Sequence, residues 1–329
     1  GAGAAAGELP SPGVHAVTIV DGRLEWQEHP DPEPGTGELL VAVRAAGING
    51  ADILQRGGHY PAPPGSPADI PGLEMAGEVV AVGPGARRFS PGSRVMAVVG
   101  GGGHGELVVV HERAAMPVPD GVPWEQAGGF PEAFTTAHDA LFSQCALAMG
   151  ERLLVNGAAG GVGTAGVQLG AAAGATVVGT CRRSDQRDAV AALGQGVTVV
   201  APDQAGGDGP YDVVLELVGG PNLAADVDAL ATNGRVAIIG VGAGHRAEVD
   251  LRTLMQRRGR ILASTLRARP LEGKAAAARA VEAHVLPLLA SGRIRVPVDA
   301  TFPMAEATTA YDRFTAGGKV GKIVLTAGP

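Results

Sequence analysis

The chain is poor in cysteine, in aromatic residues and in clustered positive charge. Its two cysteines, Cys145 and Cys181, are too few for a disulfide framework or a cysteine-based zinc site. Aromatic residues make up only 3% of the 329 residues, so each one is a candidate for a specific role. The formal net charge is −7 and no basic block occurs, which argues against nucleic acid as a partner.

Long apolar runs and a targeting segment are also lacking. No apolar run reaches the roughly 20 residues that a membrane-spanning helix needs, so we expect no membrane partner. The segment 1–13, GAGAAAGELPSPG, has neither the charged region nor the apolar region of a signal peptide. We predict that this segment is a flexible lead and that the protein works in the reducing cytoplasm.

The remaining composition is that of a globular protein with two domains. Hydrophobic residues make up 45% of the chain, charged residues 18%, and glycine occurs 52 times. Short apolar runs separated by glycine and proline turns fill the first part of the chain, which predicts a β-rich, partly closed barrel. The strands predicted there are 15–20, 26–34, 38–48, 74–82, 94–99 and 106–110, with a short helix or turn at 49–56.

The pattern changes to an alternation of strands and helices from Arg152 to about Ala263. Such alternation is typical of an α/β fold in which a doubly wound parallel sheet is covered on both faces. The predicted sheet strands are 153–156, 176–180, 198–200, 212–217, 235–240 and 260–264. Outside this region we predict helices at 123–149, 275–290 and 304–315, and a closing strand at 322–326.

A glycine-rich turn joins the first of these strands to its helix. Read from Ala158 the turn is A-x-G-x-x-G, so Gly160 would let a pyrophosphate approach the backbone and Gly163 would let the helix pack on the strand. The helix beginning near Val162 would direct free N–H groups at the phosphates. The sequence therefore predicts a dinucleotide site at Ala159, Gly160, Gly161 and Val162; a tight turn in an ordinary βα unit is the alternative.

The second strand ends on Thr180, Cys181, Arg182 and Arg183, where an acid that binds a ribose 2′-hydroxyl would often stand. A carboxylate would repel a 2′-phosphate, whereas a guanidinium holds it through charged hydrogen bonds. We therefore predict NADPH rather than NADH as cofactor, held by Arg182 and Arg183. The alternative is that both arginines are solvated charges before a helix capped by Ser184.

Several separate motifs carry a family resemblance that extends from about Val14 to Leu325. They are AGINGADILQRGGHY (46–60), PGLEMAGEVVAVG (71–83), NGAAGGVGTAGVQL (156–169) and GKVGKIVL (318–325). With them the chain resembles the zinc-independent quinone oxidoreductase branch of the medium-chain dehydrogenase/reductase superfamily. The stretches 131–141 and 264–270 are similar to its tumour-suppressor-inducible subgroup.

The resemblance implies a GroES-like catalytic domain split around a Rossmann domain that binds NADPH. The implied boundaries are 1–128 for the N-terminal part of the catalytic domain, 129–268 for the Rossmann domain and 269–329 for the C-terminal part. It also implies a homodimer joined by edge strands of the Rossmann sheet near Ile261 to Leu266.

The chain departs from zinc-dependent relatives at the positions that bind the metal. It has Asn49 where they carry a cysteine and Leu73 where they carry a histidine, and it lacks their four-cysteine lobe. We therefore expect no metal site. Lone histidines such as His104 and His111 are predicted to be surface or turn residues.

The resemblance also implies the residues that line the site. Asn49 and Tyr60 are the predicted catalytic hydrogen-bond donors, with Tyr60 also beside the nicotinamide; alternatively, the Tyr60 ring only fills the domain interface. Asp52 is interpreted as a helix cap. The other residues implied near the cofactor or the substrate mouth are Thr135, Val218, Gly240, Val241, Thr265, Leu266, Arg267 and Lys319.

The predicted reaction is hydride transfer from NADPH to a small apolar quinone or to an α,β-unsaturated carbonyl. Neutral hydrogen-bond donors suffice there because the anion that forms is delocalised. Two alternatives stay open: an enoyl reductase acting on carrier-bound thioesters, and a non-catalytic NADPH-binding protein similar to lens crystallins.

Overall fold

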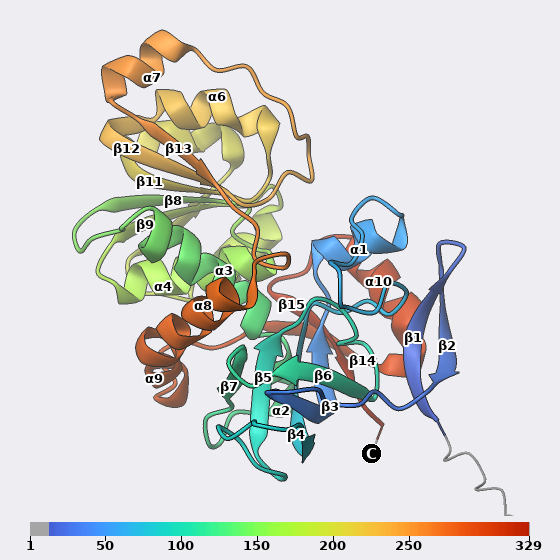
Figure 1. Ribbon diagram of the computed structural model, residues 1–329. Coiled ribbons are helices and arrows are strands. Elements are labelled where there is room, and N and C mark those ends of the chain that lie inside the picture. The colour runs from blue at the N-terminus through green and yellow to red at the C-terminus, as the bar shows by residue number, and fades with distance from the viewer. Residues whose placement is uncertain (1–12, 329) are drawn as a thin grey trace, which may run out of the picture.

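The computed structural model describes residues 13–328, so most of the predicted flexible lead lies outside the described residues. Figure 1 shows two sheet-bearing parts with helices between them, and the predicted α/β fold with a GroES-like domain is confirmed. Within the described residues, no helix is long and apolar enough to span a bilayer.

The first part is a six-stranded parallel sheet in the order β10-β9-β8-β11-β12-β13. Its strands are β8 (Arg152–Asn156), β9 (Thr176–Thr180), β10 (Val197–Val200), β11 (Tyr211–Glu216), β12 (Leu230–Ile238) and β13 (Arg260–Ala263). The strand order reverses between β8 and β11, which is where sheets of this type bind nucleotides.

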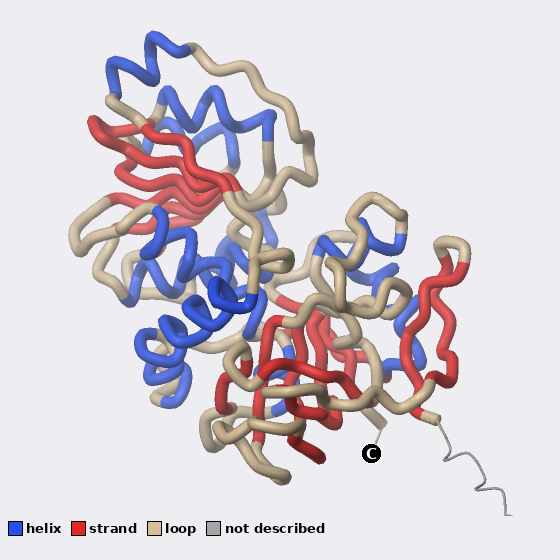
Figure 2. The backbone as a smooth tube through the Cα atoms, in the orientation of Figure 1, coloured by secondary structure: helices blue, strands red, loops and turns tan. Residues whose placement is uncertain are grey.

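Helices cover both faces of this sheet (Figure 2). They include α4 (Gly161–Ala172), α5 (Arg187–Ala191), α6 (Gly220–Asp228) and α7 (Leu251–Arg257), with two 3-10 segments, η2 (Ser184–Gln186) and η3 (Pro202–Asp208). Strands buried from both sides explain the continuous apolar runs that marked them in the sequence.

The second part is a seven-stranded sheet. Five of its strands precede the six-stranded sheet in the sequence, and two follow it. The strands are β3 (Glu38–Gly47), β4 (Glu74–Val82), β5 (Arg94–Val98), β6 (Leu107–His111), β7 (Ala115–Pro117), β14 (Val298–Pro303) and β15 (Lys322–Thr326). β15 pairs antiparallel with β3, with Val324 opposite Gly47. The exact division at residues 128 and 268 stays a prediction.

A β-hairpin at one side of this sheet shows where a predicted strand was misplaced. The strand predicted at 26–34 is β2 (Arg23–His29), which pairs with β1 (Val14–Val20). The turn residues Asp21 and Gly22 have φ values of 48° and 76°, which is the geometry of a two-residue hairpin turn. The hairpin therefore sets the start of β2, and the proline after His29 ends it.

Several predicted helices are divided in the structure. The region 123–149 forms α2 (Trp124–Gly128), α3 (Pro131–His138) and a π-helix, η1 (Asp139–Gln144). The region 275–290 forms α8 (Leu271–His284) and α9 (Leu286–Ala290), because Pro287 lacks the N–H that would continue the first helix. The predicted helix at 304–315 begins as η4 (Met304–Glu306) and continues as α10 (Ala307–Thr315), and α1 (Gly50–Arg56) is a helix as predicted.

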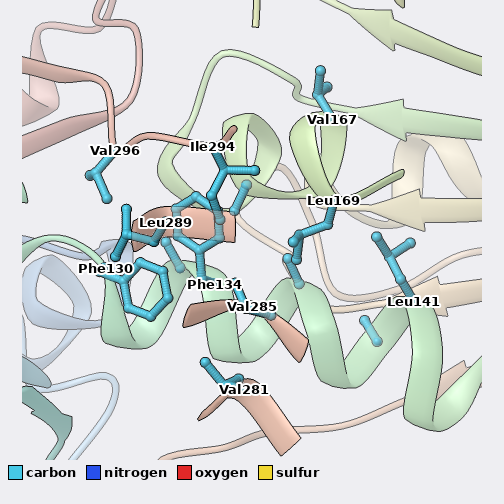
Figure 3. Close-up of a cluster of buried hydrophobic side chains, with 14 of the residues drawn as sticks. Phe130, Phe134, Leu141, Val167, Leu169, Val281, Val285, Leu289, Ile294 and Val296 are labelled. Atoms are coloured by element: carbon cyan, nitrogen blue, oxygen red, sulfur yellow. The ribbon is translucent and has the colours of Figure 1, made fainter. Parts of the chain in front are cut away.

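The largest apolar core lies around α3, between the two sheets. Phe130 and Phe134 stack with ring centroids 4.7 Å apart, and α3 packs against α4 on one side and α8 on the other (Figure 3). Strands of both sheets contribute to the same core, among them residues Met96 and Val155. A shared core fixes the end of α3 that faces the candidate site.

Candidate functional site

A buried polar cluster forms where element ends of the second sheet meet the glycine-rich turn. Asn49 directly precedes α1, Glu74 begins β4 and Lys322 begins β15. We call Asn49, Glu74 and Lys322 the cleft cluster. The relative exposure of the side chains is 0% for Glu74 and 3% for Lys322.

Lys322 is held by three acceptors. Its Nζ lies 2.7 Å from Oε1 of Glu74, 2.7 Å from Oδ1 of Asn49 and 3.1 Å from the carbonyl oxygen of Ile48. Asn49 in turn donates from Nδ2 to Oε1 of Glu74 at 3.0 Å. The ammonium group thus has its full set of partners, and it fixes the orientation of the Asn49 amide.

Asp52 accepts hydrogen bonds from two segments next to this cluster, so it does more than cap the helix α1. Its Oδ2 accepts the N–H of Asn49 at 2.8 Å, and its Oδ1 accepts the N–H of Gly72 at 2.9 Å. Burial raises the pKa of Asp52, against the lowering effect of His104. These bonds tie the start of α1 to the segment before β4.

His104 lies in a turn, as one part of the prediction has it, but it is fully buried, so the prediction of a surface residue is wrong. Its Nδ1 lies 3.1 Å from the hydroxyl of Tyr311 and its Nε2 lies 3.1 Å from the carbonyl oxygen of Gly47. Both ring nitrogens are engaged, so His104 braces the end of β3 that leads into Asn49.

The ring of Tyr60 lies against the guanidinium of Arg267, whose Cζ is 5.1 Å from the ring centroid. Burial raises the pKa of Tyr60, so its hydroxyl stays protonated. Arg267 is 2% exposed and donates to the carbonyl oxygens of Gly100 (2.8 Å) and Tyr60 (3.3 Å) and to Oε1 of Gln55 (2.5 Å). Each of its side-chain nitrogens has a protein acceptor, so Arg267 fastens the Tyr60 loop.

Three of the four glycines in the turn, Gly157, Gly160 and Gly163, differ in what the structure requires of them. Gly157 has a φ of 79°, which provides the sharp exit from β8. A Cβ on Gly163 would collide with the carbonyl oxygen of Gly157, so close helix packing requires glycine there. A Cβ on Gly160 would meet protein no closer than 3.7 Å, so neither packing nor backbone conformation explains this glycine.

Two residues of the predicted set, Thr135 and Leu266, line one small cavity beside α3. Its walls are Val98, Ala114, Met116, Thr135, Leu266, Lys274 and Ala278. The hydroxyl of Thr135 is buried and has no hydrogen-bond partner among residues 13–328. Thr265 precedes Leu266 in the chain, and its backbone carbonyl oxygen accepts a hydrogen bond from Nε of Arg269 at 2.8 Å.

The arginines after β9 lie on the surface. Arg183 donates to Asp185 through Nε (3.1 Å) and through a terminal nitrogen (2.6 Å), and both side chains are about three-fifths exposed. Arg182 is also exposed. Arg183, rather than Ser184, is the residue that precedes η2, so the alternative of a Ser184 cap is wrong.

The segment 318–322 lies along the nucleotide turn. The N–H of Gly321 donates to the carbonyl oxygen of Ala159 at 2.8 Å, and Gln186 donates to the carbonyl oxygen of Lys319 at 2.7 Å. The Nζ of Lys319 donates to the carbonyl oxygen of Gly321 at 3.1 Å. Burial and the neighbouring Lys322 lower the pKa of Lys319 to about 8.

The remaining predicted residues follow the sheet strands. Val218 comes after β11 and contacts the turn, because its side chain lies 3.3 Å from a Cβ built on Gly157. Gly240 and Val241 come after β12, where a Cβ on Gly240 would collide with Leu217. The structure thus joins Asn49 to the nucleotide turn through Lys322, and it places Thr135 and Leu266 on one cavity. Arg182 and Arg183 follow β9 at the same edge of the sheet as the turn, and a Cβ on Gly318 would lie 3.4 Å from the guanidinium carbon of Arg183.

The sequence analysis missed Glu74, Glu132 and Lys322. Glu74 and Lys322 each stand at the start of an apolar strand, inside motifs used for the resemblance. A charge at the buried end of a strand was the available signal. Within residues 13–328, no group of three or more His, Cys, Asp or Glu side chains is arranged to hold a metal ion.

Comparisons with known proteins agree with this architecture. A family model described as alcohol dehydrogenase GroES-like domain matches residues 35–120, and one described as zinc-binding dehydrogenase matches residues 185–325. The chain is 32% identical over 315 residues to the quinone oxidoreductase of Pseudomonas aeruginosa. The aligned region covers 92% of this chain and 95% of that protein.

Two further relatives differ in kind. Over 337 residues the chain is 35% identical to erythronolide synthase EryA2 of Saccharopolyspora erythraea, covering 97% of this chain but 9% of that synthase. The chain thus spans less than a tenth of that synthase. The structure of mycobacterial Rv1454c complexed with NADPH matches with a TM-score of 0.82 and 28% identity, covering 95% of this chain and 99% of that one.

The parallel sheet, its glycine turn and the split second sheet define a protein with the nucleotide-binding fold of dehydrogenases. The chain belongs to the medium-chain dehydrogenase/reductase superfamily, so the resemblance to that superfamily is confirmed.

Proposed function

We propose that the protein is a zinc-independent, NADPH-dependent reductase of quinones or α,β-unsaturated carbonyls. The observation that carries the proposal is the position of the cleft cluster directly beside the nucleotide turn. A Cβ on Gly161, at the start of α4, would lie 2.7 Å from Cδ of Lys322. Lys322 therefore touches both the nucleotide turn and the Asn49 amide.

The residues of the turn fit a dinucleotide. Gly160 leaves open backbone where a pyrophosphate would approach, and α4 begins directly after it with free N–H groups. The orphaned hydroxyl of Thr135 fits a polar group of the nicotinamide side. The exposed Arg182 and Arg183 directly after β9 favour a 2′-phosphate, for which Arg183 would exchange its exposed pair with Asp185. When bound, NADPH supplies the hydride.

The protein's own residues then stabilise charge on the substrate. The Asn49 amide has one N–H on Glu74 and a second that no acceptor among residues 13–328 occupies, so it can donate to a substrate oxygen. Lys322 and Glu74 prevent the amide from rotating away. Tyr60 provides an aromatic wall and a protonated hydroxyl. Donors that are oriented before the reaction are more effective than donors that must reorganise.

The donor set at this position does not suit zinc. The carbonyl oxygen of the Asn49 amide is bound to an ammonium group, and Leu73 offers no ligand and is 1% exposed. A catalytic zinc needs three nitrogen, sulfur or carboxylate ligands with an open position. No step of the proposed reaction therefore involves a metal ion.

We also propose a homodimer formed through β13, which is the edge strand of the six-stranded sheet. Ile261 on β13 is 37% exposed, and Leu251 and Met255 on the adjacent α7 are 67% and 77% exposed. An unpaired edge with apolar neighbours is a favourable surface for pairing with a second copy. Light scattering of the wild type and of Ile261→Lys checks this expectation.

The second candidate function is an enoyl reductase acting on carrier-bound thioesters. The similarity to EryA2 across 97% of this chain favours it. Both reactions place a negative charge on a carbonyl oxygen, so the cleft cluster serves either one.

An assay of NADPH oxidation over quinones, simple enones and enoyl pantetheine thioesters separates the candidates, with NADH run in parallel. We expect turnover with quinones or enones and a preference for NADPH. Activity only on the thioesters establishes the second candidate. NADPH binding without turnover on any substrate establishes a non-catalytic nucleotide-binding protein.

A further inference from the structure

Glu132 stands in the first turn of α3, beside the cleft cluster. Its backbone N–H donates to Oε2 of Glu74 at 2.8 Å, which attaches the start of α3 to the cluster. Its own carboxyl is less well satisfied. Oε1 has a long bond of 3.4 Å from the hydroxyl of Thr136, and Oε2 is buried with no hydrogen-bond partner among residues 13–328.

A second unsatisfied group lies on the same turn of α3, namely the hydroxyl of Thr135. Leaving a buried polar atom unpaired costs about 1–3 kcal/mol, so native proteins rarely retain one without a reason. Two such atoms on one turn of a helix that is bonded to Glu74 of the cleft cluster indicate that a ligand completes their hydrogen bonds.

The electrostatic surroundings bring the pKa of Glu132 close to physiological pH, so that a substantial fraction of the carboxyl is neutral there. Burial, followed by the Glu74 carboxylate, raises the pKa of Glu132 to about 7, while Lys322 lowers it. The charged and titratable groups that interact with Glu132 are Asp52, Tyr60, Glu74, Arg267, Arg269, Lys274 and Lys322.

We propose that Glu132, as a neutral carboxylic acid, donates the proton that completes reduction of the substrate. The inference rests on the proposed function and identifies the proton donor that the proposed reaction requires. The hydride and its electron pair come from NADPH, which is oxidised to NADP⁺ while the substrate is reduced. The O–H bond of Glu132 breaks, the proton bonds to the anionic oxygen or the α-carbon of the substrate, and the carboxylate later regains a proton from water.

The other groups at the cleft are less suited to this role. Both oxygens of Asp52 and both oxygens of Glu74 accept hydrogen bonds from the protein. Lys322 uses all three of its N–H groups. Tyr60 has a pKa raised above its ordinary value of 10, so it is a weaker acid than Glu132 near neutral pH.

The test compares the wild type with Glu132→Gln, which keeps the shape but has no acidic proton. Glu33→Gln is the matched control, because Glu33 is exposed in a loop. We expect kcat of Glu132→Gln to fall about 10²–10⁴-fold with NADPH affinity unchanged. For the wild type, kcat/KM should decline as pH rises above about 7, and Glu132→Gln should lose this decline. The control should behave as the wild type.

A stability measurement provides a readout that needs neither substrate nor cofactor. Because the folded-state pKa of Glu132 is raised, the wild type loses stability as pH rises from the ordinary value near 4.5 to about 7. Glu132→Gln should therefore melt at a higher temperature than the wild type at pH 8 and at a similar temperature at pH 5.

The outcomes are distinguishable. An active wild type whose pH profile and turnover are unchanged by Glu132→Gln overturns the role of Glu132 and leaves the proposed function intact. Equal melting temperatures of the two proteins at pH 8 also overturn it, because Glu132 would then be an ordinary ionised carboxylate. A wild type that oxidises NADPH with no member of the substrate panel overturns the proposed function, and the role of Glu132 with it.

Discussion

Two buried carboxylate clusters in this molecule are neutralised in opposite ways. In the cleft cluster, Glu74 is paired with the ammonium of Lys322 at 2.7 Å. In the six-stranded sheet, Asn156 donates to Glu216 and to Asp226, each at 2.7 Å, and residues 13–328 bring no salt-bridge cation to either acid. We call Asn156, Glu216 and Asp226 the sheet cluster.

A proton replaces the missing cation in the sheet cluster. Glu216 accepts the N–H groups of Val218 (2.6 Å) and Gly219 (2.7 Å). Burial and the neighbouring Glu216 carboxyl raise the pKa of Asp226 well above its usual value, so Asp226 holds the proton. An ammonium keeps its charge across the physiological pH range, whereas a shared proton can be lost, so the two clusters should respond differently to pH.

The largest expected effect is that of Lys322→Met, which makes the cleft cluster resemble the sheet cluster by removing its cation. Breaking a buried pair on one side costs about 3–5 kcal/mol, because the Glu74 carboxylate is left buried without its cation. The free energy of unfolding, measured by urea denaturation, should fall by about this amount. The double variant Glu74→Gln/Lys322→Met should recover much of the loss; no recovery would mean that the packing of the lysine stem matters more than its charge.

A smaller effect is expected at the end of β9, which the sheet cluster supports. Thr180 donates to Oδ1 of Asn156 at 3.2 Å, directly before the arginines. The double variant Arg182→Ala/Arg183→Ala should weaken NADPH binding about 10-fold, because it removes charged hydrogen bonds to the 2′-phosphate. Isothermal titration measures the Kd, and NADH binding should not change. Arg293→Ala, an exposed arginine elsewhere, is the control.

The sheet cluster itself is tested by Asp226→Asn, which mimics the protonated acid. The folded-state pKa of Asp226 is raised, so wild-type stability falls as pH increases above the ordinary value near 3.8. Between pH 6 and pH 8 we expect the wild type to lose about 1.4 kcal/mol per pH unit more than Asp226→Asn. Parallel melting curves at the two pH values would show that Asp226 is ionised in the folded state.

The smallest effect is expected for Tyr60→Phe, which removes a hydroxyl that makes no hydrogen bond to residues 13–328 but keeps the ring against Arg267. Turnover should fall by about a few-fold, since one neutral hydrogen bond contributes about 1 kcal/mol. Tyr60→Leu removes the ring as well and should lower turnover further. Equal kcat values for the two variants would assign the whole contribution to the hydroxyl.

The sequence predicted those parts of the fold that depend on local patterns. Apolar runs located the strands of the parallel sheet and all strands of the other sheet except β7 and β14, and the glycine spacing located the nucleotide turn, because both signals are properties of neighbouring residues. The start of β2 was missed because a two-residue turn at Asp21 and Gly22 determines it. Partners that are distant in the chain were also out of reach: Asn49 was found by resemblance, but its contact with Lys322 joins residues 273 positions apart.

Lys322 belongs to β15, which is synthesised after all strands of the six-stranded sheet, and this order has a consequence for folding on the ribosome. The strands β8 to β13 are contiguous in the chain, so their sheet can form as a unit while translation continues. The end of β3 at residues 45–47 must wait for its partner β15, and until then it presents an open strand edge. The cleft thus closes last, and the nascent chain is most exposed to incorrect strand pairing in the interval before Lys322 leaves the exit tunnel.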